Sequence, residues 1–131
     1  MKKIIFLDID GVMNSINGEG PYIADMEVSK LKLLKSLIME TDSEGIVLIS
    51  DRRYSSRYLL ELETALDQYE IALLDTIREP SDDEDNRGKQ IQDYLASHNE
   101  IDKIVILDDI DDGISLLFKE DFILVNKFFW T

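Results

Sequence analysis

A hydrophobic run at residues 4–7 ends in the sequence Asp8-Ile9-Asp10-Gly11, and this arrangement constrains the fold more than any other feature of the chain. A continuous apolar run of this length is typical of a buried strand in a parallel sheet. Side chains alternate along a strand, so Asp8 and Asp10 point to the same side, and Gly11 allows a sharp turn after them. Two carboxylates this close repel each other unless a cation or a shared proton intervenes. The pair therefore indicates a magnesium site.

The rest of the chain alternates between helical and extended patterns. Apolar residues at spacings of three and four predict helices over 27–41, over 55–69 and from about Gly88, while short apolar runs predict strands over 3–8, 46–49, 71–74, 104–107 and 122–125. Residues 12–26 and 78–88 predict loops, and residues 113–119 a short helix. Strands that alternate with helices indicate an α/β, Rossmann-like fold in three layers around a five-stranded parallel sheet.

Composition sets the class of protein. The 131 residues fit one domain spanning 1–131, and a hydrophobic fraction of 44% is enough for a packed core. No apolar run is long enough to span a membrane, and the absence of cysteine makes a cytoplasmic location the default expectation. The formal net charge of −14 repels polyanions and attracts divalent cations, which disfavours nucleic acid as a partner unless a local basic patch exists.

Polar side chains follow three of the predicted strands, at the point where each strand ends. They are Asp8 and Asp10, then Ser50, then Asp108 and Asp109. A single Asp after a strand is most often the N-cap of a helix. Because the carboxyl ends of parallel strands converge on one crevice, polar groups on three of them favour a shared site instead. A basic residue leading a later helix, Arg87 or Lys89, would complete an anion-binding site there.

In these motifs and their order the chain resembles the haloacid dehalogenase (HAD) superfamily of phosphatases. The Asp-x-Asp-Gly sequence, the serine that ends the second strand, the basic residue at a helix start and the acidic pair after a hydrophobic strand all occur in the order typical of that superfamily. Residues 87–91 and 106–109 are similar to capless members related to the HAD domain of Swiss Army Knife RNA repair proteins. Residues 12–26 leave room for a flap but not for a cap domain.

The resemblance implies a role for each of these residues. Asp8 would be the nucleophile that forms an aspartyl-phosphate, and Asp10 the general acid and base.

Mg²⁺ would be held by Asp8, by the backbone carbonyl of Asp10, and by Asp108 and Asp109, without a preference for either of that pair. Ser50 would bind the phosphate together with Arg87, the first choice of cation, or Lys89. We therefore expect a magnesium-dependent phosphomonoesterase that acts on a nucleotide or on the phosphate at a nucleic-acid end.

Two other classes of function remain open from the sequence. A phospho-accepting receiver domain also uses an acidic cluster on a five-stranded sheet. A catalytically silent, metal-binding interaction module with the same fold is the main alternative, since Asp51 and Arg52 depart from the residues typical of the second motif. The aromatic tail, Phe128, Phe129 and Trp130, predicts either packing onto its own domain or a homodimer contact. Asn14 is expected to serve in a turn.

Overall fold

The computed structural model describes residues 2–15, 18, 20–49, 55–77 and 86–125. These residues form β1 (Lys2–Leu7), β2 (Tyr22–Ile23), β3 (Met26–Glu27), α1 (Val28–Thr41), β4 (Gly45–Ile49), α2 (Ser56–Gln68), β5 (Leu73–Ile77), α3 (Arg87–Ala96), β6 (Ile101–Asp108), α4 (Ile114–Phe118) and β7 (Phe122–Leu124). The large sheet has the strand order β5-β4-β1-β6-β7, and every neighbouring pair in it is parallel. The predicted α/β fold with a five-stranded parallel sheet is confirmed.

The strand order also distinguishes between the functional classes. Numbered along the chain, the five strands of the sheet are arranged 3-2-1-4-5, which is the doubly wound order of Rossmann-type sheets. Receiver domains have the order 2-1-3-4-5 instead, so the receiver interpretation does not fit this topology. In the observed order the chain reverses direction across the sheet between β1 and β6, and ligands of open α/β sheets bind at such a switch point.

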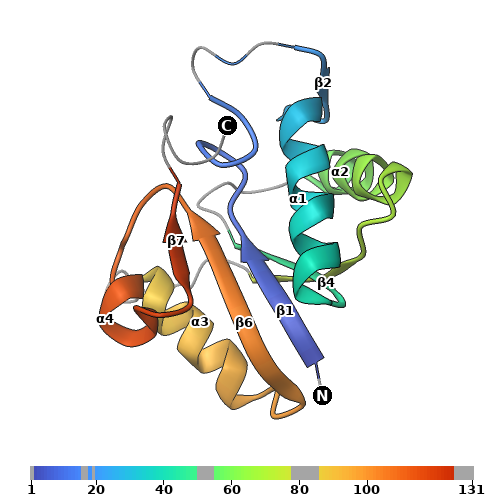
Figure 1. Cartoon of the computed structure of the whole chain (residues 1–131). Helices are drawn as coiled ribbons and strands as arrows, with labels where there is room; N and C mark the ends of the chain where they lie inside the picture. Colours follow the sequence, from blue (N-terminus) through green and yellow to red (C-terminus); the bar gives the residue numbers. More distant parts are fainter. Residues whose placement is uncertain (1, 16–17, 19, 50–54, 78–85, 126–131) are drawn as a thin grey trace.

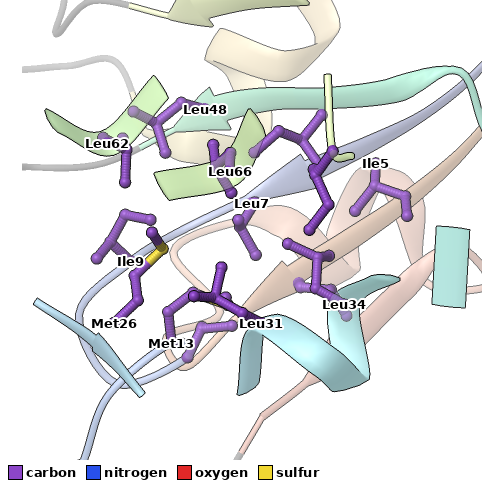
Figure 2. Packing of buried hydrophobic residues seen from close by; sticks show 14 of the residues in the cluster. Ile5, Leu7, Ile9, Met13, Met26, Leu31, Leu34, Leu48, Leu62 and Leu66 are labelled. Carbon is purple, nitrogen blue, oxygen red and sulfur yellow. The ribbon is translucent and has the colours of Figure 1, made fainter. Parts of the chain in front are cut away.

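Helices cover both faces of the sheet, as Figure 1 shows, with α1 and α2 on one face and α3 and α4 on the other. The side chains of β1 point alternately to the two faces of the sheet, so this strand contributes to the hydrophobic core on each face. Ile5 and Leu7 pack with residues of α1 and α2 (Figure 2), whereas Ile4 and Phe6 pack with residues of α3 and α4. A fully buried side chain of this kind contributes about 1.5–3 kcal/mol. The central strand is therefore held from both sides, and its carboxyl end is a rigid place for a site.

The bounds of two strands differ from the sequence prediction by more than one residue. The third strand of the large sheet, β5, begins at Leu73 rather than at residue 71, because α2 ends in a left-handed turn at Glu70 (φ 57°) and the amide of Ile71 donates to the carbonyl of Leu66. Ile71 is thus buried as part of that turn. Strand β6 begins at Ile101, earlier than predicted, because its first residues pair with the start of β1.

The segment predicted as a loop over residues 12–26 contains a small antiparallel hairpin, β2–β3. Its two-residue turn places Ala24 at φ 50° and Asp25 at φ 62°, the left-handed geometry that hairpin turns of this length require. The prediction missed it because such turns usually contain Asn or Gly. Met26 anchors the hairpin in the same core cluster as Leu31 of α1 (Figure 2). Nothing larger is inserted between β1 and α1 in the described ranges, which agrees with a capless fold.

No helix among the described residues is long and apolar enough to cross a membrane. The aromatic residues 128–130 lie outside the described ranges, so a homodimer contact through them stays a prediction.

Candidate active site

The two central strands bring the first and the last motif together. The parallel register pairs Leu7 with Leu107, and the amide of Asp8 donates to the carbonyl of Leu107 at 3.1 Å. Asp8 therefore leaves β1 beside Asp108, the last residue of β6. Both carboxylates are buried, with exposed fractions of 2% for Asp8 and 0% for Asp108. The sequence predicted this convergence from the rule that parallel strands end at one edge.

Three carboxylates form an acidic cluster at this edge. Asp8, Asp108 and Asp109 each offer an oxygen, and these oxygens lie within 4.8 Å of one another. Asp8 Oδ1 and Asp109 Oδ1 are buried and have no hydrogen-bond partner in the described part of the chain. Buried carboxylate oxygens without partners are costly unless a proton or a cation satisfies them. Hard oxygen donors are the ligands that Mg²⁺ prefers, so the cluster fits a divalent cation of this kind.

Gly11 is required by the close approach of Asp109 to the first motif. Its φ of +80° lies in the region that side chains disfavour, and an added Cβ would lie 2.1 Å from Asp109 Oδ2. The backbone immediately after Asp10 thus leaves room for a carboxylate from the loop after β6. The glycine of the Asp-x-Asp-Gly sequence turns the chain and also admits the third member of the acidic cluster.

Arg87 supplies the positive charge of the site. Its side chain is 5% exposed, and its Nη1 lies 3.3 Å from Asp8 Oδ2 and also contacts Asp108 Oδ2. The start of α3 is fixed by Asp112, whose carboxylate accepts a hydrogen bond from the Arg87 amide at 3.0 Å. The side chain of Asn86 caps the same helix by accepting from the amide of Lys89 at 2.9 Å. These contacts aim the guanidinium at the two buried carboxylates.

The other predicted site residues differ in their placement. Lys89 is exposed, and its predicted contact with phosphate stays a prediction. Asp10 is partly buried and lies next to the cluster without contributing to it; its Oδ1 is 3.5 Å from Asn14 Nδ2. Ser50 falls outside the described residues, so its predicted contact with phosphate stays a prediction.

With the geometry established, comparison with known proteins identifies the family. A family model described as the HAD domain in Swiss Army Knife RNA repair proteins matches residues 4–128, nearly the whole chain. The chain belongs to this family. It is therefore a HAD-type phosphatase domain, and the resemblance inferred from the four motifs is confirmed. No curated protein sequence matches the chain.

Among solved structures, this HAD domain is similar to D,D-heptose 1,7-bisphosphate phosphatase from B. bronchiseptica, whose crystal structure was determined in complex with magnesium and phosphate. The TM-score is 0.56 at 17% sequence identity, and the match covers 86% of this chain and 72% of the other. At this identity the likeness establishes the fold. The acidic cluster of this HAD domain fits the Mg²⁺ cofactor that the sequence motifs predict.

The raised pKa values of the buried carboxylates in the HAD site show the excess negative charge that a bound cation would compensate. Burial raises the pKa of Asp8 from 3.8 to about 7, the charge of Asp108 acts in the same direction, and the Arg87 guanidinium opposes both. Burial likewise raises the pKa of Asp108 to about 6, again against Arg87. One arginine thus compensates only part of the negative charge. A divalent cation would supply the remainder and keep Asp8 ionised at neutral pH.

Sequence reasoning missed Asp112, and for Asn14 it favoured a role in a turn over a contact near the site. Asp112 holds the first turn of α3, and Asn14 lies between the first motif and the hairpin. Asp112 could have been noticed as one of several acidic residues after β6, but nothing local marks it as a partner of a helix 25 positions earlier. Asn14 follows Gly11 by three positions, a spacing that suits a side chain folding back onto a turn.

Proposed function

We propose that this domain is a magnesium-dependent phosphomonoesterase in which Asp8 is the nucleophile. The observation that carries the proposal is the convergence of Asp8, Asp108 and Asp109 with Arg87 at the switch point of the sheet. A buried carboxylate flanked by a cation-binding cluster and a guanidinium is suited to attack a phosphate ester. The family and the magnesium-and-phosphate complex of a protein with the same fold support this function.

The reaction proceeds in two displacements. A carboxylate oxygen of Asp8 attacks phosphorus, the bond to the ester oxygen breaks, and Asp10 gives its proton to the leaving oxygen. Asp10 then removes a proton from water, which attacks the aspartyl-phosphate, so that inorganic phosphate leaves and Asp8 is regenerated. When bound, Mg²⁺ neutralises the carboxylates and the phosphate oxygens. Arg87 has five N–H donors, enough to hold Asp8 and a phosphate oxygen together, and Ser50 and Lys89 are proposed to add donors.

The proposed substrate is a phosphate on a nucleotide or at a nucleic-acid end. The description of the family, an HAD domain in RNA repair proteins, supports this class. A capless fold leaves the edge of the sheet accessible to a large substrate. The net charge of −14 opposes the approach of a long polyanion, so we expect turnover of an oligonucleotide end to rise with added salt and that of a mononucleotide to change less.

The test is turnover by the purified protein with Mg²⁺. Substrates would be p-nitrophenyl phosphate, mononucleotides, and oligonucleotides with a 3′- or a 5′-phosphate, each at low and high salt. Asp8→Asn should abolish turnover, whereas Asp102→Asn, the same change at an exposed position near the opposite end of β6, should have no effect. Trapping a phosphorylated protein in the wild type, but not in Asp8→Asn, would support the covalent intermediate.

A different outcome would favour the alternative. Mg²⁺ binding that depends on Asp8, without turnover of any phosphate ester, would contradict the enzymatic proposal and support a silent metal-binding interaction module. A single domain over residues 1–131, a cytoplasmic location and a homodimer through the aromatic tail stay predictions within this proposal.

A further inference from the structure

Asn14 makes contacts that a simple turn residue does not need. Its Oδ1 accepts a hydrogen bond from the amide of Gly11 at 3.1 Å, and its Nδ2 donates to the carbonyl of Asp25 at 2.9 Å. The same Nδ2 lies 3.5 Å from Asp10 Oδ1. The orientation of the amide is determined by these partners, because the reverse orientation would place a donor against an N–H and an acceptor against a carbonyl. Asn14 therefore connects the carboxylate of Asp10 to the hairpin.

The hairpin end of this connection is held from a second side. The turn places Ala24 and Asp25 in the left-handed region, which costs about 1 kcal/mol for a residue with a Cβ. The carbonyl of Ala24 accepts a hydrogen bond from the Tyr58 hydroxyl of α2 at 3.0 Å, and the carbonyl of Asp25 accepts from Asn14. The side chains of Tyr58 and Asn14 thus each donate a hydrogen bond to one carbonyl of this strained turn. The amide of Asn14 gains a fixed position from which it can orient Asp10.

We propose that Asn14 is a positioning residue for the general acid: it holds Asp10 toward the leaving group and ties it to the β2–β3 hairpin. The inference rests on the proposed phosphatase function. At 3.5 Å the Asn14–Asp10 contact is long, and such contacts commonly shorten when substrate binds. Asn14 neither touches the phosphate nor joins the acidic cluster in this arrangement.

The experiment compares leaving groups, because a positioned acid matters only when the leaving oxygen needs a proton. p-Nitrophenolate is stable enough to leave without a proton, whereas the alkoxide leaving group of glycerol 2-phosphate needs one. We expect Asn14→Ala to lower kcat/KM for the alkyl phosphate by about 30-fold or more and for p-nitrophenyl phosphate by less than about threefold. The ratio kcat/KM reports the transfer to Asp8 alone, so the later hydrolysis does not obscure the comparison. Asp10→Asn should give the same pattern with a larger loss.

Two further variants separate positioning from loss of structure. Asn14→Asp keeps the shape and the acceptor for the Gly11 amide but removes both donated hydrogen bonds, so it should share the selective loss. Tyr58→Phe loosens the hairpin at Ala24 without removing Asn14 and should change both substrates by the same small factor. Equal losses on the two substrates in both Asn14 variants would overturn the inference while leaving the phosphatase function intact. Absence of turnover by the wild type would overturn both.

Discussion

Replacing Asp8 with asparagine should stabilise the metal-free protein near neutral pH, although it removes the proposed nucleophile. The folded-state pKa of Asp8 is raised from 3.8 to about 7, so ionising this carboxylate in the folded protein is unfavourable. The stability associated with its protonated form is fully present below about pH 4 and is lost as the pH rises through 7. Asparagine has the same shape and no charge, so the variant does not undergo this loss.

The size of the effect follows from the shift. Each unit of pKa corresponds to about 1.4 kcal/mol, so the full shift of Asp8 is equivalent to about 4 kcal/mol. Asp8 and Asp108 titrate as an interacting pair, so only part of this energy belongs to Asp8. We expect the difference in the free energy of unfolding between Asp8→Asn and the wild type to grow by about half of it, roughly 2 kcal/mol, from pH 5 to pH 8. For a domain of this size that corresponds to a difference in Tm of about 6 °C.

The assay is thermal unfolding from pH 5 to pH 8 in EDTA, followed by the same series with excess Mg²⁺. The exposed Asp102→Asn variant carries the same charge change and corrects for the general effect of the net charge of −14. Excess Mg²⁺ at about 100 times its Kd should stabilise the wild type by about 2.7 kcal/mol at pH 8, and should stabilise Asp8→Asn much less. Parallel pH profiles for Asp8→Asn and the wild type in EDTA would refute the argument from burial.

Three further predictions follow from the contacts of the site. Gly11→Ala should lower the Mg²⁺ affinity, measured by calorimetry, by about tenfold and destabilise the fold by roughly 2 kcal/mol, because the new Cβ would meet Asp109 at a φ of +80°; an unchanged affinity would contradict this role. Arg87→Met should lower the free energy of unfolding in urea by about 3 kcal/mol without metal, since two buried carboxylates lose their cation, whereas Arg87→Lys should lose less. Asp112→Asn should raise KM by about tenfold with little change in kcat, because a weaker acceptor for the Arg87 amide loosens the end of α3 that is proposed to bind phosphate; a loss confined to kcat would be inconsistent with it.

The fold was predictable because its strongest signals are local. The apolar run before Asp8 and the similar runs that end at Ile49 and Leu107 mark buried parallel strands, and the apolar stripes of α1, α2 and α3 follow the helical period. The hairpin was not predictable in the same way. Its turn uses Ala24 and Asp25 where Asn or Gly is usual, and the contacts that hold it come from outside the hairpin, from Tyr58 of α2 and from Asn14.

The amino-acid sequence by itself determined the alternation of strands and helices, the carboxylates that follow two central strands, and the family. Those features depend on residue type and spacing, which short-range geometry converts into strands, helices and turns. Only the tertiary structure decided that Arg87 contacts the two buried carboxylates, that Asp109 fills the space beside Gly11, and that Asn14 reaches Asp10. These relations depend on the register between β1 and β6 and on how α3 packs against the sheet, which arise from packing across the whole chain and not from any one segment.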